Sequence, residues 1–347
     1  MRSSRARHAA IVAASVCAVL PAAAAAQYPL VATPVIPLGN LSPSIKLGGY
    51  VSVRDTKHGD STSFAVNRAR LTAMIAPLPY LAVRVQVDFS GNQTETVSSS
   101  NTVHGFELTD AYVEFAQAVA DSVRWGQFHP ALIVGQFKQP FSLEYLTSFA
   151  YLRTANRATA IDQLTPKRDI GAMGQVQWSH FVTADASVTN GEGANALSNP
   201  DGRELLIGRV TVTPFTWLAL AAKLGNEGTD HLRGYDGRIM WRDLLIEGEG
   251  IHRSRPLGGD HQDAGGGYVL AAYTFLPWLQ PVFKREWFND TRQLDDTNTD
   301  TRDGWSTFGV NLITPRENLR FLTDWIVKSH RPARAVNEVD FQLVANF

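Results

Sequence analysis

Residues 80–90 read YLAVRVQVDFS, and apolar and polar side chains alternate along them. The apolar set is Leu81, Val83, Val85, Val87 and Phe89, and the residues between them include Arg84, Gln86 and Asp88. Successive side chains of a β-strand point to opposite faces of the sheet. The stretch therefore predicts a strand that presents one apolar face and one polar face.

The same two-residue period recurs in about sixteen segments, and the final stretch, VDFQLVANF at 339–347, is a clear case. The segments fall near 45–54, 63–76, 80–90, 106–117, 131–138, 168–178, 180–189, 203–213, 216–225, 233–242, 243–252, 265–275, 278–288, 304–313, 318–329 and 336–347. The boundary between the fourth and fifth segments, around 117–131, stays open. The chain is predicted to be all-β.

The connections between these segments alternate in length. Those after odd-numbered strands are long and polar, such as NDTRQLDDTNTDTRD, and those after even-numbered strands are mostly tight, such as PLP and PFT. Long loops at one end and short turns at the other are typical of membrane barrels. The pattern predicts a sixteen-stranded antiparallel transmembrane β-barrel, with Tyr80, Trp217 and Trp278 in an aromatic girdle at the short-turn end.

The N-terminus predicts export. Arg2, Arg5 and Arg7 precede the apolar run AAIVAASVCAVL and the small-residue run PAAAAA, so residues 1–26 are interpreted as a cleaved signal peptide. Residues 27–44 form a proline-rich lead-in, and 45–347 form the barrel. Removing residues 1–26 changes the formal net charge from −1 to −4, which gives no sign of nucleic-acid binding. The single cysteine, Cys17, excludes an internal disulfide.

The connection after the fifth strand, 139–167, differs from the other long loops. It carries Phe141, Leu143, Tyr145, Leu146, Phe149, Tyr151 and Leu152, whereas the other loops are rich in Gly, Asn, Asp, Thr and Ser. An apolar segment of this kind is unfavourable in water, and a sixteen-stranded barrel has an aqueous lumen wide enough to receive it. We expect this third outer loop to fold inward and narrow the pore.

Four motifs carry a resemblance to a known family. VGQFKQPFSLE (134–144), YLRT (151–154), KRDIGA (167–172) and VNRARL (66–71) resemble the phosphate-selective porin O and P family. The resemblance covers the mature chain in order. It implies a trimeric bacterial outer-membrane channel in which the third loop forms the constriction and cationic side chains select anions.

Eight cations are the candidate selectivity residues: Arg68, Arg70, Arg84, Lys138, Arg153, Arg157, Lys167 and Arg168. Alternation places Arg68, Arg70 and Arg84 on the lumen side, and residue matching favours Arg68 and Arg153, then Lys138. Phosphate recognition requires several fixed donors of this type. An alternative is that Arg68 and Arg70 pair with Asp88, Asp110 or Glu114. Asn67, where the family often has arginine, and the acidic mature chain leave phosphate preference open.

Other functions are less well supported. A non-selective porin, a barrel enzyme and an adhesin are the alternatives, but no G-x-S-x-G or H-E-x-x-H motif occurs. Asp296, Asn298 and Asp300 have calcium-like spacing, yet Thr307 stands where an EF-hand requires glutamate. No enzyme, metal or cofactor is expected. The expected partners are small anions such as phosphate, outer-membrane lipid, two further copies in a homotrimer, and the barrel-assembly machinery, which would recognise Phe347.

Overall fold

A computed structural model describes residues 44–78, 80–90, 106–116, 128–257, 260–294, 297–331 and 335–347. The predicted signal peptide and all but the last residue of the proline-rich lead-in lie outside the described residues. So does most of the 117–131 stretch whose strand boundary the sequence left open. Among the described residues, no helix is both long and apolar enough to span a membrane.

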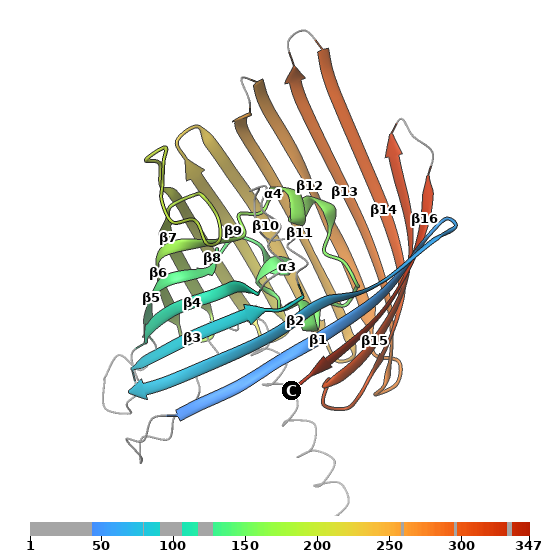
Figure 1. Cartoon of the computed structure of the whole chain (residues 1–347), viewed down its shortest axis with the longest axis horizontal. Coiled ribbons are helices and arrows are strands. Elements are labelled where there is room, and N and C mark those ends of the chain that lie inside the picture. The colour runs from blue at the N-terminus through green and yellow to red at the C-terminus, as the bar shows by residue number, and fades with distance from the viewer. Residues whose placement is uncertain are drawn as a thin grey trace, which may run out of the picture.

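Sixteen strands in the described chain form one closed antiparallel barrel (Figure 1). Each strand pairs with its neighbours in sequence, and β1 closes the ring by pairing with β16. This confirms the predicted fold class. The strands are β1 Ser44–His58, β2 Ser61–Leu78, β3 Leu81–Asp88, β4 Glu107–Ala116, β5 Phe128–Lys138, β6 Arg168–Trp178, β7 Val182–Thr189, β8 Leu205–Phe215, β9 Leu218–Glu227, β10 Asp230–Trp241, β11 Leu244–Leu257, β12 Asp260–Tyr273, β13 Leu279–Leu294, β14 Thr297–Ile313, β15 Leu319–Arg331 and β16 Val336–Asn346.

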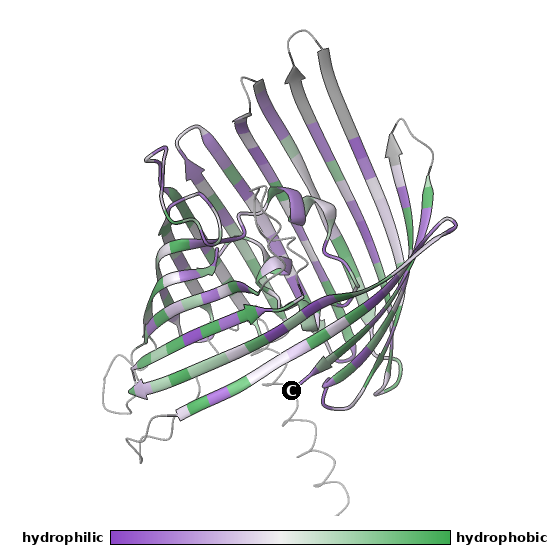
Figure 2. Ribbon diagram, in the orientation of Figure 1, coloured by the Kyte–Doolittle hydropathy of each residue, from purple (hydrophilic) through white to green (hydrophobic). Residues whose placement is uncertain are grey.

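The alternation in the sequence becomes an alternation between lumen and outer surface. Along β8, buried and exposed residues follow each other one by one: Ile207 and Arg209 are buried, and Leu206 and Val210 are exposed. Bands of opposite hydropathy accordingly follow one another along the strands (Figure 2). One face of each strand contacts the lumen, and the other forms the apolar outer surface.

Several connections predicted to be long loops are instead extended hairpins. β1 and β2 pair as far as His58 and Ser61, and β13 and β14 pair as far as Leu294 and Thr297. Backbone N–H and C=O groups can pair whatever the side chains are, so polar composition does not end a strand. The truly long connections within the described chain are 139–167 and 190–204.

Aromatic rings gather at the short-turn end. Phe215 and Trp217 stack with centroids 5.1 Å apart, and Trp217 meets Trp241 edge-on at 5.6 Å. Tyr80 and Trp278, at two other short turns, are more than half exposed. Exposed amphipathic rings at one level are favoured at a membrane interface.

The C-terminal residue takes part in closing the barrel. Phe347 and Gly49 exchange both backbone hydrogen bonds at 3.0 Å, so the pairing of β16 with β1 continues to the last residue. The Phe347 side chain remains 71% exposed.

Residues 139–167 lie within the ring of strands rather than beyond it (Figure 1). This inner segment contains α3 (Leu143–Leu146), the 3-10 turn η1 (Phe149–Tyr151) and α4 (Thr159–Leu164). Helix α4 packs on β11, β12 and β13. Gly266 of β12 allows the close approach of both neighbours, because a Cβ at this position would lie 2.4 Å from the Trp287 carbonyl oxygen of β13 and 2.7 Å from the Cβ of Ala160 in α4.

Gly266→Ala is therefore expected to displace α4, to strain the neighbouring backbone of β13 and to destabilise the barrel by about 1–3 kcal/mol, the usual cost of overpacking. Gly208→Ala is the matched control, because a Cβ there would meet no atom within 4 Å. The midpoint of heat-induced mobility change on gel electrophoresis should fall for the first variant only. Equal midpoints for both variants would contradict close packing of α4 on β12.

Candidate functional site

The inner segment covers apolar residues of the barrel wall. Phe141, Tyr145, Ile161 and Leu164 pack with wall residues of β8, β10, β11, β12 and β13, namely Leu205, Ile207, Leu232, Ile251, Ala264, Tyr268, Leu270, Ala272, Val282 and Phe288. Phe149, Ala150 and Leu152 pack with Tyr50, Leu322 and Val344 of β1, β15 and β16. Burial on both sides fixes the inner segment to half of the wall.

Three wall carboxylates accept hydrogen bonds from the backbone of this segment. Glu249 of β11 accepts from the N–H groups of Leu143 and Glu144 at 3.2 Å and from the Ser142 hydroxyl at 2.9 Å. Farther along, Glu286 accepts from Thr159 N–H at 2.7 Å, and Asp324 accepts from Ala155 N–H at 2.6 Å. These bonds satisfy donors that would otherwise be buried without a partner.

Wall cations satisfy the carbonyl groups in the same way. Arg320 donates to the carbonyls of Ala150 and Leu152 at 2.6 and 2.8 Å. Lys284 donates to Asn156 O, and Arg209 donates to Phe141 O, each at 2.8 Å. Arg54 donates to Ala155 O and to the Asn156 side chain. The wall thus holds the inner segment through charge-assisted hydrogen bonds from both signs of charge.

A buried charge network lies behind the first of these contacts. Lys223 of β9 bridges Asp236 of β10 and Glu249 of β11, and Arg209 of β8 also pairs with Asp236 at 2.8 Å. All four side chains are at least 96% buried. The sequence analysis did not identify this network. Two features of the sequence could have indicated this network. Some strands are apolar on both faces, such as LLIG in β8 and YVLAAY in β12, and neighbouring strands place charged residues on the lumen side.

Most of the eight predicted cations gather between the inner segment and strands β2–β6. Arg70 pairs with Asp88 at 2.8 Å, and Arg68 lies 3.9 Å from the same carboxylate. Arg84 and Arg168 share Asp110, at 3.0 and 2.7 Å. The ion pairing that the sequence left as an alternative for Arg68 and Arg70 is therefore present with Asp88, whereas Asp110 pairs with Arg84 and Arg168 instead.

The other four predicted cations come from the inner segment and its two ends. Lys138 donates to Tyr145 O at 2.7 Å, and Arg157 donates to Glu144 O at 3.4 Å. Arg153 lies apart from the cluster and pairs with Glu317 at 3.5 Å. Lys167 is half-buried, and its carbonyl accepts from Gln139 N–H at 2.9 Å.

Cations and aromatic rings alternate through the middle of this cluster. The guanidinium carbon of Arg68 lies 5.2 Å from the centroid of the Phe149 ring. Arg157 lies over both Phe149 and Tyr145, at 5.7 and 4.8 Å, and Lys138 lies 5.2 Å from the Tyr145 centroid. Each contact is worth about 0.5–2 kcal/mol. The series links β2 and β5 through the inner segment, so these cations have a positioning role as well as a charge.

Glu144 is the acidic group at the centre of the inner segment. It accepts from Ala158 N–H at 2.8 Å and lies 3.6 Å from the Lys284 ammonium. Burial raises the pKa of Glu144 to about 7, although Lys284 and the Ala158 N–H lower it. Its protonation therefore changes near neutral pH.

The described residues hold no group of three or more His, Cys, Asp or Glu side chains arranged for a metal ion. The calcium-like spacing noted in the sequence includes Asp296, which lies outside the described residues. The geometry at hand is that of a barrel whose charged inner wall binds the inner segment.

Comparisons with known proteins agree with this geometry. The family model described as phosphate-selective porin O and P matches residues 48–240. No curated protein sequence matches the chain. Similar solved structures include a loop L8 deletion mutant of OmpT, an outer membrane protein of Vibrio cholerae, with a TM-score of 0.64 at 11% identity, covering 88% of this chain and 100% of that one.

Two further structures have the same fold. The in-vitro folded trimer form of OmpT has a TM-score of 0.61 at 10% identity, and the anion-selective porin from Comamonas acidovorans has 0.61 at 11%. Each covers 88% of this chain and 100% of its own. These identities establish a shared fold.

Glu249→Gln is expected to loosen the inner segment. The amide keeps the side-chain volume but replaces one acceptor oxygen with a donor, so Ser142 or Leu143 loses its partner and Lys223 loses a counter-charge. Breaking a buried charged pair costs about 3–5 kcal/mol. Single-channel conductance should rise, and proteases should cut within 139–167. Asp185→Asn is the control, because Asp185 bonds to Gln175 on the neighbouring strand; the same conductance gain there would contradict tethering by Glu249.

The raised pKa of Glu144 predicts a pH dependence. The folded protein holds this proton up to about pH 7, whereas the unfolded chain releases it near 4.5. Stability should fall by about 3 kcal/mol as pH rises from 4.5 to 7 and then level off. Glu144→Gln keeps an acceptor for Ala158 N–H and should remove this slope, measured as protease protection of 139–167. Asp162→Asn, at an exposed position in α4, should keep the wild-type dependence of stability on pH. If Glu144→Gln showed the same pH dependence as Asp162→Asn, Glu144 would not be the titrating group.

Proposed function

The chain belongs to the phosphate-selective porin O and P family, and on that premise we propose that it is an anion-preferring diffusion channel of the bacterial outer membrane. The inner segment 139–167 is its constriction. Small solutes pass through water in the remaining lumen, and phosphate is the anion whose chemistry best fits the donors. The observation that carries the proposal is the uneven distribution of charge around the inner segment.

Cations outnumber carboxylates on the side formed by β2–β6. Six cations lie on this side, namely Arg68, Arg70, Arg84, Lys138, Arg157 and Arg168, together with five carboxylates, namely Asp88, Glu107, Asp110, Glu114 and Asp169. On the half of the wall that binds the inner segment, buried carboxylates outnumber buried cations. The carboxylates are Asp230, Asp236, Glu247, Glu249, Glu286, Asp290, Asp324, Glu338 and Asp340, and the cations are Arg209, Lys223, Arg238, Lys284 and Arg320. In a narrow passage with low-dielectric walls, the excess of cations on the side formed by β2–β6 attracts anions.

The cations differ in how far a solute can reach them. Arg68, Arg70, Arg157 and Arg168 are at least 95% buried, which supports a role in setting the local potential and holding the inner segment. The Arg84 and Arg153 side chains keep 16% and 22% of their surface exposed. We therefore assign direct contact with passing anions to Arg84 and Arg153, with Lys138 and Lys167, both half-buried, next in line.

Phosphate preference rests on donor geometry. The planar guanidinium groups of Arg84 and Arg153 can each offer two parallel N–H donors to a tetrahedral oxyanion, whereas lysine offers a movable point charge. Carboxylates on the same wall repel a doubly charged anion. Asp110 already pairs with the Arg84 guanidinium, which leaves fewer donors of that group for phosphate. A non-selective porin is the alternative that the test below separates.

The remaining expectations belong to the same proposal. Residues 1–26 direct export and are removed, and the barrel inserts with help from assembly machinery that reads the exposed ring of Phe347. The proposed channel is a homotrimer, and in-vitro folded OmpT, which has a similar fold, has a trimer form. Outer-membrane lipid contacts the apolar outer face.

Arg84→Gln and Arg153→Gln should each lower the ratio of anion to cation permeability. A unit charge at 4 Å in water is worth about 1 kcal/mol, roughly a five-fold change in that ratio. The measurement is the reversal potential of planar bilayers in a chloride salt gradient, repeated with added phosphate as competitor. Arg203→Gln, at an exposed position in the 190–204 connection, is the control.

Three results separate the readings. If the reversal potentials of Arg84→Gln and Arg153→Gln matched that of the Arg203→Gln control, anion preference would be overturned in favour of a non-selective porin. A change in reversal potential without block by phosphate would keep anion preference and reject phosphate preference. An absence of conductance steps in the wild type would reject the channel itself.

A further inference from the structure

The outer surface of β10–β13 contains a groove that the proposed channel does not use. Tyr235, Gly250, Gly267 and Trp287 are paired in register across four neighbouring strands. The two central positions have no side chain, and the cavity beside the two aromatic rings has a glycine floor formed by Gly234, Gly250, Gly265 and Gly266. The cavity has a volume of about 480 Å³, within the range of about 300–1,000 Å³ typical of small-molecule sites.

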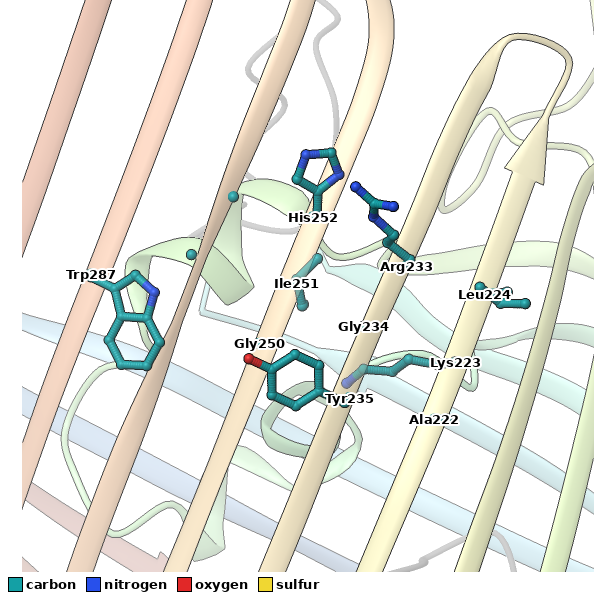
Figure 3. A pocket seen from close by; sticks show the side chains of 12 residues that line it. Ala222, Lys223, Leu224, Arg233, Gly234, Tyr235, Gly250, Ile251, His252 and Trp287 are labelled. Carbon is teal, nitrogen blue, oxygen red and sulfur yellow. The ribbon is translucent and has the colours of Figure 1, made fainter.

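The groove faces away from the lumen. Its neighbours on the same face are large exposed apolar residues, among them Leu224, Val269 and Phe283. Tyr235 is 68% exposed and Trp287 39%. The Tyr235 ring lies against Gly250, where a Cβ would come within 2.8 Å of the ring. Figure 3 shows the Tyr235 ring next to Gly250, with Trp287 on the other side of Gly250.

Positive charge stands at one end of the groove. Arg233 and His252 pair directly in the β10–β11 register, one step toward the outer end of the strands from Tyr235 and Gly250. Their head groups lie near each other above the groove (Figure 3). His252 Nε2 lies 2.6 Å from a carboxylate oxygen of Asp263. Within the described chain, Arg233 has no carboxylate partner within ion-pair distance.

An unpaired arginine on a lipid-facing surface requires an explanation. Such a charge costs about 2–4 kcal/mol at the middle of the membrane and about 0–1 kcal/mol near its interface. The position near the outer end of β10 fits the interface, where an anion from the lipid itself can pair with the guanidinium. Arginine is well suited to phosphate because its planar fork donates two parallel hydrogen bonds.

We propose that this groove binds one phosphorylated lipid of the outer leaflet. The lipid phosphate sits on Arg233 and His252, and one acyl chain lies along the glycine floor between Tyr235 and Trp287. The groove has polar side chains at one end and a single apolar trough behind them, which matches the shape and polarity of an amphipathic molecule. A second copy of this chain would need about 800 Å² of contact on each partner for a stable interface, which this narrow depression does not provide.

The test measures lipid binding to the full-length mature barrel in detergent by native mass spectrometry. The probe is a diphosphorylated glucosamine lipid, compared with the same lipid after removal of its phosphates. The wild type should retain one probe molecule, and the Arg233→Ala/His252→Ala variant should bind it at least ten-fold more weakly. Dephosphorylation of the probe should weaken binding to the wild type by a similar factor.

Arg285→Ala is the matched control. Arg285 is also an exposed arginine on the outer face, but it donates to the Ser306 hydroxyl at 2.8 Å, so its loss should leave probe binding unchanged. Trp287→Ala keeps Arg233 and His252 and removes one side of the groove. It should weaken binding of the long-chain probe more than that of a short-chain analogue.

Several results would overturn the proposal. If the double variant bound the probe as well as the Arg285→Ala control, Arg233 and His252 would not form the phosphate site. If the wild type bound the dephosphorylated probe as well as the phosphorylated one, the groove would not recognise phosphate. Competition by inorganic phosphate as strong as by the lipid would indicate a free-anion site. A change in oligomeric mass in the double variant would indicate a subunit contact. Heat-modified gel mobility identifies any variant that fails to fold.

Discussion

The structure depends on one constraint: a peptide segment placed inside a closed barrel must find partners there for its own backbone. Strand pairing uses the backbone groups of the wall, so only side chains remain available to the inner segment. Carboxylates on β11, β13 and β15 accept from its N–H groups, and cations on β8, β13 and β15 donate to its carbonyls. The lumen is charged because it has a segment to hold as well as a solute to pass.

This requirement explains why charge and apolar surface occur side by side on the inner wall. Tyr268 and Leu270 face inward from β12 and would be unfavourable against water, but α4 covers them. Lys223 and Glu249 are buried behind α3 without exposure to the passage. Buried ion pairs of this kind contribute little net stability on average, so their main effect here is to fix where the inner segment lies. Glycine has a comparable effect at Gly266, where the absence of a side chain sets the distance between helix and wall.

The two faces of the barrel wall meet different chemical demands. Inside, arginines are paired with carboxylates, carbonyl groups or aromatic rings, as Arg70, Arg320 and Arg68 illustrate. Outside, most positions are apolar, and the exposed arginines Arg233 and Arg285 differ in that Arg285 donates to the Ser306 hydroxyl whereas Arg233 has no carboxylate partner within the described chain. One period-two pattern thus encodes an inner surface that binds its own chain and an outer surface that meets lipid.

The sequence by itself determined the strands, their number and the faces of their side chains, because alternation is a local property that any strand must express. It also identified 139–167 as unlike the other loops, because composition is local too. It did not determine which cations remain accessible, since Arg68 and Arg84 lie on equivalent faces in the sequence yet differ in burial once Phe149 packs over Arg68. It missed the extension of β13 and β14, because backbone pairing does not depend on polarity. Tertiary structure decided these points because they depend on which distant strands meet across the lumen.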